Sequence, residues 1–206
     1  AEAGYYPKEE IMTLRKLGSR LQGHPHRGAL PGLEASGGPL AQGISIAAGM
    51  AVAGRIDGRR CRVYCMIGDV ESDEGQVWEA LMFIGANRLH NLTLVIDRNN
   101  IQIDGFTENV MPLEQVRDKL EAFRFHVIEV NGHNIRQLVD AFEEAGSIYE
   151  KPTAVLAHTI PGKGVDFMEF KPEWHGKPPN HEEAEKALSE LEQLRSLGGK
   201  ITCETE

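Results

Sequence analysis

Short apolar runs alternate along the chain with longer segments in which apolar residues recur at helical spacing. Four runs are rich in β-branched residues and have the length of buried strands, at positions 62–67, 92–96, 126–130 and 153–158. Amphipathic segments at 74–89 and 134–150 join the first pair and the second pair of these runs. Strands that alternate with helices predict an α/β fold, a parallel sheet flanked by helices on both faces.

Two helices are predicted before the first strand. Residues 7–21 carry an apolar stripe at helical spacing, formed by Ile11, Leu14, Leu17 and Leu21. Residues 39–55 are rich in alanine and glycine, which suits a helix packed closely against other backbone. A loop at 22–38 is expected to connect the two helices.

A last helix is predicted at the end of the chain, at 180–197. One face of the stretch 182–197 carries Ala184, Ala187, Leu188, Leu191 and Leu194. Gly198-Gly199 is expected to end this helix. A chain of 206 residues is long enough for one sizeable α/β domain covering 1–206, and no internal repeat divides it.

The net charge and the positions of the cysteines exclude several kinds of partner and site. The formal charge of −9 and the absence of a basic patch argue against nucleic acid or an anionic membrane as a partner. No apolar stretch approaches the roughly 20 residues of a membrane span, and no leader precedes the domain, so a cytoplasmic protein is expected. Cys61 and Cys65 fall on one face of a predicted strand and Cys203 in the polar tail, an arrangement that favours reduced thiols over a disulfide or zinc site.

Polar residues with metal-binding chemistry follow two of the predicted strands. Gly68, Asp69 and Val70 end the first run, and Asn99 and Asn100 end the second. The carboxyl ends of parallel strands meet at one edge of a sheet, so Asp69 and Asn99 should converge. Carboxylate and carboxamide oxygens suit Mg²⁺, which keeps open positions for phosphate oxygens. Ordinary caps and turns are the alternative explanation for these residues.

Longer motifs around these strand ends resemble those of a known family. The segments 68–80 (GDVESDEGQVWEA), 91–92 and 96–105 (IDRNNIQIDG) closely resemble the thiamine-diphosphate motif of transketolases. Further matches follow the family order and extend the resemblance over nearly the whole chain, at 23–25, 30–32, 38–43, 162–165 and 174–176. The resemblance implies a thiamine-diphosphate-binding fold, with thiamine diphosphate and Mg²⁺ as cofactors and Ca²⁺ or Mn²⁺ as possible substitutes.

The resemblance also implies a set of metal-binding and cofactor-binding residues. Asp69, Asn99 and the backbone carbonyl of Ile101 resemble the family's metal ligands. Gly68 and Val70 lie where the backbone approaches the diphosphate. The family has a second glycine in place of Val70. A positive φ there would strain a valine by about 1–3 kcal/mol, and the hypothesis is that Val70→Gly tightens thiamine diphosphate binding.

Two histidines and one loop resemble substrate-binding and cofactor-binding elements. His24 resembles a residue that contacts substrate hydroxyls, and His175 one beside the diphosphate and the substrate carbonyl. Either could be an ordinary loop histidine, although histidine suits proton transfer near neutral pH. Gly38 and Leu40 resemble residues that hold the aminopyrimidine ring, and the alternative is a helix N-terminus with Pro39 in its first position.

Glu74 resembles a glutamate that lies near the subunit interface and takes part in a carboxylate relay between paired active sites. The alternative is an acidic residue in the first turn of a helix, favoured there by the helix dipole. His158 ends a predicted strand just before Gly162-Lys163-Gly164, so it is also a candidate to line the cleft.

The implied reaction is transfer of a two-carbon ketol unit from a ketose phosphate to an aldose phosphate, as in the pentose phosphate pathway. The family's activating glutamate lies in a second, pyrimidine-binding domain, so the chain is expected to need a C-terminal transketolase subunit and to form a heterotetramer. Family members also carry roughly fifty more residues before the point where this chain starts, including a Gly-His pair, which makes catalysis by this chain alone doubtful.

Three alternatives to this function are weighed. A 1-deoxyxylulose-5-phosphate synthase shares the domain, but segments 163–169 and 174–176 favour a split transketolase. A catalytically silent binding or scaffold subunit would be consistent with Val70 and the missing start. A nicotinamide dehydrogenase is not supported, because no Gly-x-Gly-x-x-Gly follows a strand.

Overall fold

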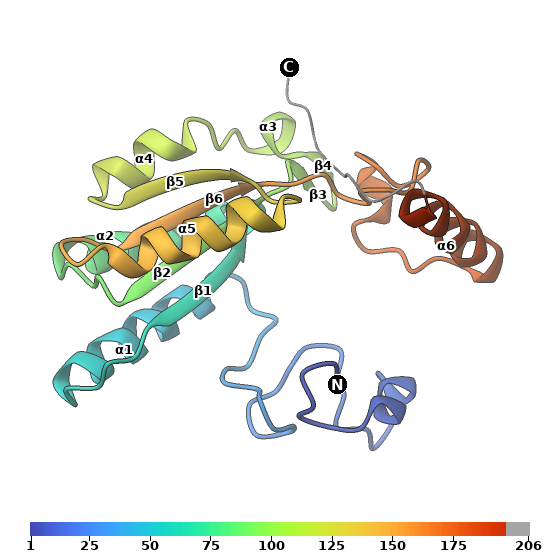
Figure 1. The fold of residues 1–206 in the computed structure, drawn as a ribbon, viewed down its shortest axis with the longest axis horizontal. Coiled ribbons are helices and arrows are strands. Elements are labelled where there is room, and N and C mark those ends of the chain that lie inside the picture. Colours follow the sequence, from blue (N-terminus) through green and yellow to red (C-terminus); the bar gives the residue numbers. More distant parts are fainter. Residues whose placement is uncertain (197–206) are drawn as a thin grey trace.

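The computed structural model describes residues 1–196 and contains a four-stranded parallel sheet (Figure 1). Its strands lie side by side in the order β1-β2-β6-β5. Their bounds are β1 (Val63–Gly68), β2 (Leu92–Arg98), β5 (His126–Asn131) and β6 (Thr153–His158). All four predicted strands are present, and the parallel sheet is confirmed.

Helices cover both faces of the sheet, as predicted (Figure 1). One face packs against α1 (Gln42–Ile56), α2 (Gly75–Ala86) and α4 (Val116–Ala122), and the other against α5 (Ile135–Ser147). The first layer buries Ile44, Ala48, Leu81, Ile84, Leu120, Leu94 and Ile96, and the second buries Val95, Val130, Ala141, Val155 and Ala157. The central strands β2 and β6 are therefore apolar on both sides, as buried parallel strands are.

Helix α1 starts three residues later than the sequence predicts. Its N-cap is Ala41, which has a φ of 66°, and the first helical residue is Gln42. Pro39 therefore precedes the helix and does not occupy its first position. The small residues Ala47, Ala48 and Ala51 are buried, so the helix backbone lies close to the sheet and to α2.

The sequence did not predict several short elements. These are η2 (Val70–Asp73), the antiparallel pair β3 (Ile101–Gln102) and β4 (Gly105–Phe106), α3 (Thr107–Val110), α4, and η3 (Pro172–Trp174). Elements of two to seven residues are too short to show a strand or helix period in the sequence. Most of them lie at the carboxyl edge of the sheet, where they carry side chains of the site described below.

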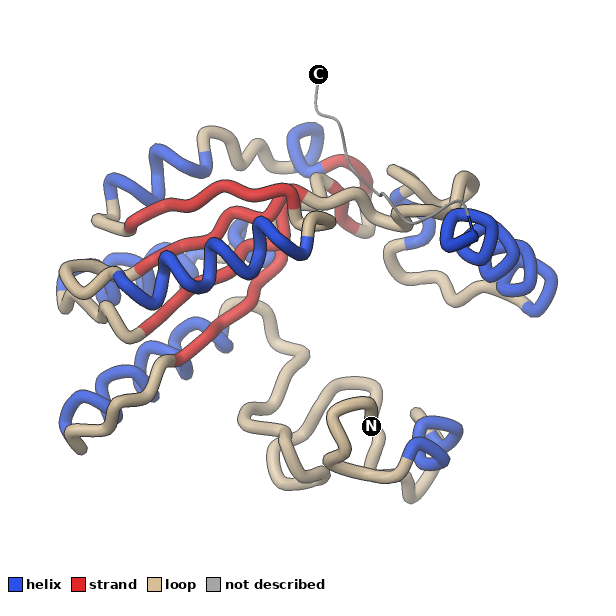
Figure 2. Tube along the Cα trace, in the orientation of Figure 1, coloured by secondary structure: helices blue, strands red, loops and turns tan. Residues whose placement is uncertain are grey.

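The prediction of a helix at 7–21 is wrong. Only the 3-10 helix η1 (Lys8–Thr13) forms, and the rest of residues 1–40 is loop (Figure 2). Arg15 and Gly18 have positive φ values of 60° and 80°, which a continuous helix excludes. Ile11, Leu14 and Leu17 are exposed, so the apolar stripe has no surface against which a helix would be stabilised.

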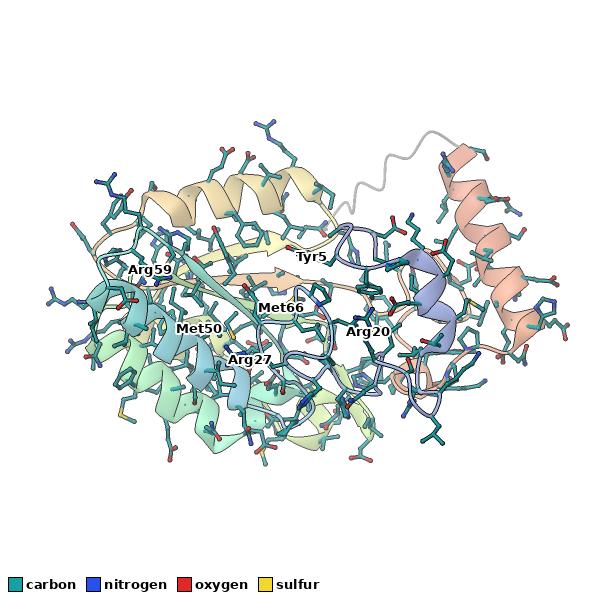
Figure 3. The ribbon with its side chains drawn as sticks, turned by 90° about the horizontal axis from the view of Figure 1, so that it is seen from below. Tyr5, Arg20, Arg27, Met50, Arg59 and Met66 are labelled. Carbon is teal, nitrogen blue, oxygen red and sulfur yellow. The ribbon has the colours of Figure 1, made fainter. Side chains whose placement is uncertain are left out.

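Local contacts hold this N-terminal segment together. Arg20 forms an ion pair with Glu10 at 2.6 Å, and the ring of Tyr5 lies against Gly32, where a Cβ would be 2.9 Å from Tyr5 Cγ. Figure 3 labels Tyr5 and Arg20 on this segment. Its backbone forms no strand of the sheet.

The C-terminal helix α6 spans His181–Ser196. It starts one residue after the start of the predicted helix 180–197, and one residue before the stretch 182–197 that carries the apolar face. Leu197, the glycines expected to end the helix and Cys203 lie outside the described residues. Within residues 1–196, no helix has the length and apolar character needed to cross a membrane.

Candidate active site

The carboxyl ends of β1 and β2 meet at Asp69, as the sequence predicts. The backbone N–H of Asp69 donates to the Asp97 carbonyl at 3.2 Å. The Asp69 carboxylate is buried, and its two oxygens have different partners. Oδ1 accepts a hydrogen bond from the Val70 N–H at 2.8 Å, and Oδ2 accepts one from the Asn100 N–H at 2.7 Å.

Asn99 and Ile101 face a cavity of about 630 Å³ that His175 also lines. The Asn99 carboxamide is held in place because its Nδ2 donates to Asp97 Oδ2 and its Oδ1 accepts from the Ile101 N–H, both at 3.1 Å. The opposite wall comes from the 161–179 loop and α6, whose contributions include Val165, Met168, Trp174, Ala184, Ala187, Leu188 and Leu191. Three predicted site residues thus share one cavity.

His175 is exposed and follows η3, and its backbone N–H donates to the Pro172 carbonyl at 2.9 Å. Beside it, Trp174 Nε1 donates to the Phe167 carbonyl at 3.0 Å, and Lys177 Nζ lies 4.2 Å from the Trp174 ring centroid. These contacts fix the backbone at His175 and leave its imidazole free to face the cavity.

Val70 lacks the positive φ on which the strain argument depends. Val70 begins the 3-10 helix η2, and it is absent from the residues with positive φ in the described part of the chain. Glycine is required only where φ lies in the left-handed region. The condition for strain at Val70 is therefore not met, and the hypothesis that Val70→Gly tightens cofactor binding loses this support.

The residues at the strand ends carry oxygen donors of the kind that Mg²⁺ binds, and Asp69 itself is buried and does not line the 630 Å³ cavity. A Cβ built on Gly68 would meet no atom within 4 Å, so the backbone there has open space beside it. No cluster of three His, Cys, Asp or Glu side chains in residues 1–196 could hold a metal. A metal here would instead use the mixed oxygen donors Asp69, Asn99 and the carbonyl of Ile101, a donor set suited to Mg²⁺.

A buried arginine that the sequence analysis missed also belongs to this site. Arg98 Nη1 forms an ion pair with Asp69 Oδ2 at 2.8 Å, and their side chains are 2% and 1% exposed. Arg98 Nη2 contacts Glu108 at 2.7 Å and Glu114 at 2.9 Å. An arginine two positions after the apolar run 92–96 was the available sequence signal, because a charged residue is buried only when paired.

Negative charge exceeds positive charge around Arg98. Partial burial and the carboxylates of Asp69 and Glu108 raise the pKa of Asp73. The hydrogen bond from Arg98 lowers the pKa of Glu114, against the opposing effect of burial. Burial alone would lower the pKa of Arg98, but its bonds to Glu114 and Asp69 outweigh this effect and raise it.

The predicted aminopyrimidine and substrate residues lie together, outside the cavity. The His24 ring packs on Gly38, where a Cβ would be 3.0 Å from His24 Cγ and φ is +114°. The Gly37 N–H donates to the Pro25 carbonyl at 3.0 Å and closes this loop. His24 and Leu40 are exposed, and neither lines the cavity that contains His175.

Glu74 is the exposed N-cap of α2, and its side chain makes no capping hydrogen bond. Another glutamate connects the two loops of the site. Glu71 Oε1 accepts a hydrogen bond from the Ala41 N–H at 2.7 Å, which ties the start of α1 to η2. The cofactor motif and the predicted aminopyrimidine loop are thereby joined.

His158 lines a different cavity, of about 420 Å³, at the ends of β5 and β6. Its Nε2 lies 3.0 Å from Glu129 Oε2, and His133 lines the same cavity. His133 Nε2 accepts a hydrogen bond from the Ile160 N–H at 2.7 Å. The expectation that His158 lines the cavity of Asn99 and His175 is wrong.

The family model for the transketolase thiamine diphosphate binding domain matches residues 3–193. The chain is also 42% identical over 189 residues to a 6-deoxy-6-sulfo-D-fructose transketolase subunit of Clostridium sp. (strain MSTE9), covering 92% of this chain and 69% of that protein. An apulose-4-phosphate transketolase subunit of Actinobacillus succinogenes is 39% identical, and the match covers 93% of this chain and 69% of that protein.

A solved structure agrees with these matches. Transketolase from Campylobacter jejuni superimposes with a TM-score of 0.84 at 32% identity, over 89% of this chain and 30% of that chain. The chain therefore spans about two thirds of the two transketolase subunits and under a third of the longer enzyme.

Proposed function

Because the chain belongs to the transketolase family, as a thiamine-diphosphate-binding domain, we propose that it is the N-terminal subunit of a split transketolase and transfers ketol units together with a partner chain. One observation carries the proposal. The Asp69 carboxylate meets the Asn100 backbone at 2.7 Å, while Asn99 and Ile101 face one cavity with His175. Metal and diphosphate ligands would thus lie beside a titratable side chain.

The position of each predicted site residue supports a specific role. Asp69, Asn99 and the carbonyl of Ile101 would hold Mg²⁺, or Ca²⁺ or Mn²⁺ in its place, and the open space at Gly68 would admit the diphosphate. His175 can donate a hydrogen bond or a proton to an oxygen in the cavity. Bound thiamine diphosphate supplies the electron sink for breaking a carbon–carbon bond next to a carbonyl.

His24, with Gly38 and Leu40, is proposed to bind substrate hydroxyls and the aminopyrimidine ring. Glu74 is proposed to take part in the relay between paired sites, and its exposure at the start of α2 leaves it accessible to another subunit. The contact between Glu71 and the Ala41 N–H supports a common site, because it joins the loop after Leu40 to the cofactor motif.

The proposed partner is a C-terminal transketolase subunit carrying the pyrimidine-binding domain, in a heterotetramer. The matched relatives are named as transketolase subunits, one for a sulfo-sugar and one for a sugar phosphate. We therefore propose sugar phosphates as substrates. The net charge of −9 favours neither nucleic acid nor membrane as a partner, and a cytoplasmic location is proposed.

Calorimetric titration with thiamine diphosphate in saturating Mg²⁺ tests the proposal. The wild-type chain should bind, and Asp69→Ala should not. Because Asp69→Ala also leaves Arg98 unpaired, Asn99→Ala is the second variant, and it should weaken binding at least tenfold, about 1.4 kcal/mol. Asn87→Ala, at an exposed asparagine after α2, is the matched control and should bind like wild type.

Absence of binding by the folded wild-type chain, both alone and with the partner subunit, would contradict the proposal. A wild-type chain that binds the cofactor but supports no ketol transfer with its partner would instead favour the catalytically silent subunit.

A further inference from the structure

Arg98 lies directly before Asn99, a residue assigned to the cofactor site, yet its side chain points into the protein. It occupies the last position of β2, where Asp97 and Asn99 on either side are half-buried and Arg98 is 1% exposed. A buried guanidinium is stable only with close, well-oriented partners. Its partners therefore reveal the role of this residue.

Those partners come from three separate segments at the carboxyl edge of the sheet. Asp69 follows β1, Glu108 lies in α3, and Glu114 lies in the stretch before α4. All three contacts use the terminal nitrogens Nη1 and Nη2, at 2.7–2.9 Å. The planar guanidinium thus fixes the orientation of Asp69 relative to α3 and to the stretch before α4.

The hydrogen bonds of Asp69 divide its two oxygens unequally. Oδ2 accepts from Arg98 Nη1 at 2.8 Å and from the Asn100 N–H at 2.7 Å, with Thr107 Oγ1 at 3.5 Å. Oδ1 accepts only from the Val70 N–H among the described residues. A carboxylate oxygen accepts about two strong bonds, so Oδ2 has its full number and Oδ1 has one position left.

We propose that Arg98 is a positioning residue for the cofactor metal: it holds Oδ2 of Asp69 and so presents Oδ1 to the cation. This inference rests on the proposed function, because it requires that Asp69 bind a metal. Arg98 would act without touching the cation.

Arg98 has two opposing electrostatic effects on a cation. Its positive charge repels a metal held by the same carboxylate, and its hydrogen bonds fix that carboxylate in one orientation. Glu108 and Glu114 neutralise the guanidinium, so one positive charge faces three carboxylates in this cluster. The repulsion is therefore offset, and the orientation of Asp69 is the larger effect.

The test is calorimetric titration of Mg²⁺ into the full chain at saturating thiamine diphosphate, well below the unfolding midpoint of every variant. Arg98→Lys keeps the charge but loses the planar fork and should weaken Mg²⁺ binding at least tenfold. Arg98→Met should weaken it further. The control is Arg117→Met, which removes an exposed arginine that also contacts two carboxylates, and it should bind Mg²⁺ as wild type does.

The measurement separates positioning from stability. A structural role alone would lower the unfolding midpoint of Arg98→Lys while leaving its Mg²⁺ dissociation constant unchanged, and that result would overturn the inference. An equal weakening of Mg²⁺ binding in Arg117→Met would overturn the inference as well. If Arg98→Met fails to fold, the Mg²⁺ dissociation constant of Arg98→Lys tests the inference by itself. If wild type binds neither Mg²⁺ nor thiamine diphosphate, both alone and with the partner subunit, the proposed function fails, and the inference fails with it.

Discussion

At the sheet edge, the local backbone conformation can accommodate a residue type other than the one expected. Val70 occupies the place of a family glycine, but the chain turns there through the 3-10 helix η2 with Asp69 as its N-cap. This conformation is open to any L-residue. The substitution therefore costs no backbone strain, and only its side-chain volume remains to affect the cofactor.

Val70→Gly should leave the dissociation constant of thiamine diphosphate within about threefold of wild type, because no strain is relieved. It should also lower the free energy of unfolding by about 0.5–1 kcal/mol, since glycine loses more conformational freedom in a helix. Calorimetry and urea denaturation measure the two quantities. Tenfold tighter binding would show that the valine side chain obstructs the cofactor.

Cys65 is expected to resist thiol reagents. Burial, and secondarily the charge of Glu71, raise the pKa of its thiol from an ordinary 9.0 to about 11. Cys61 is exposed. At pH 8, iodoacetamide should modify Cys61 in the folded chain and spare Cys65 until the chain unfolds, as peptide mass mapping would detect. Rapid modification of Cys65 in the folded state would contradict this assignment.

The same shift predicts a loss of stability at alkaline pH. The folded state binds the Cys65 proton more tightly than the unfolded state, so this contribution is complete below pH 9 and disappears as the pH approaches 11. Its size is on the order of 2–3 kcal/mol. Cys65→Ala should lack this part of the decline in the free energy of unfolding, and an identical decline in both proteins would argue against it.

Helices and strands are held in place by contacts at their ends as well as by their apolar faces. Among residues 1–196, α5 is the helix that covers the second face of the sheet. The Asn134 side chain caps it by accepting from the Arg136 and Gln137 N–H groups at 3.0 and 3.2 Å. Asn131 N–H donates to Gln137 Oε1 at 2.8 Å and ties the helix start to β5.

Asn134→Ala should reduce the free energy of unfolding by about 1 kcal/mol, because two N–H groups lose their acceptor. Asn134→Asp keeps an acceptor at the cap and should remain within a few tenths of a kcal/mol of wild type. Urea denaturation of the three proteins provides the comparison. Equal stability of wild type and Asn134→Ala would mean that water replaces the cap without cost.

At the scale of the whole molecule, apolar side chains remain exposed on the edge strand β1 and on helix α1. Tyr64 and Met66 of the edge strand β1 are 56% and 69% exposed, and Met50 of α1 is also exposed. Figure 3 shows Met50 and Met66 on the view from below. Tyr64 and Met66 leave part of the edge strand β1 uncovered, and Met50 adds an exposed apolar side chain on α1, which is consistent with a chain that functions within a larger assembly.

The chain alone should therefore show no ketol transfer, and activity should appear when the C-terminal subunit is added. A coupled assay of aldose phosphate formation or consumption, with the partner titrated against a fixed amount of this chain, measures the dependence. Full turnover without the partner would refute it.

The amino-acid sequence was enough to predict the strands, the parallel sheet and the meeting of the β1 and β2 carboxyl ends, because these depend on short-range patterns and on the common direction of neighbouring strands. The convergence of the Asp69 and Asn99 side chains on a metal stays a prediction. Other features depend on contacts between distant parts of the chain. The stripe at Ile11, Leu14 and Leu17 has helical spacing but no surface to pack against, so no helix forms there beyond η1. Arg98 and Asp69 are 29 residues apart, and only the folded sheet edge reveals that they form a buried ion pair.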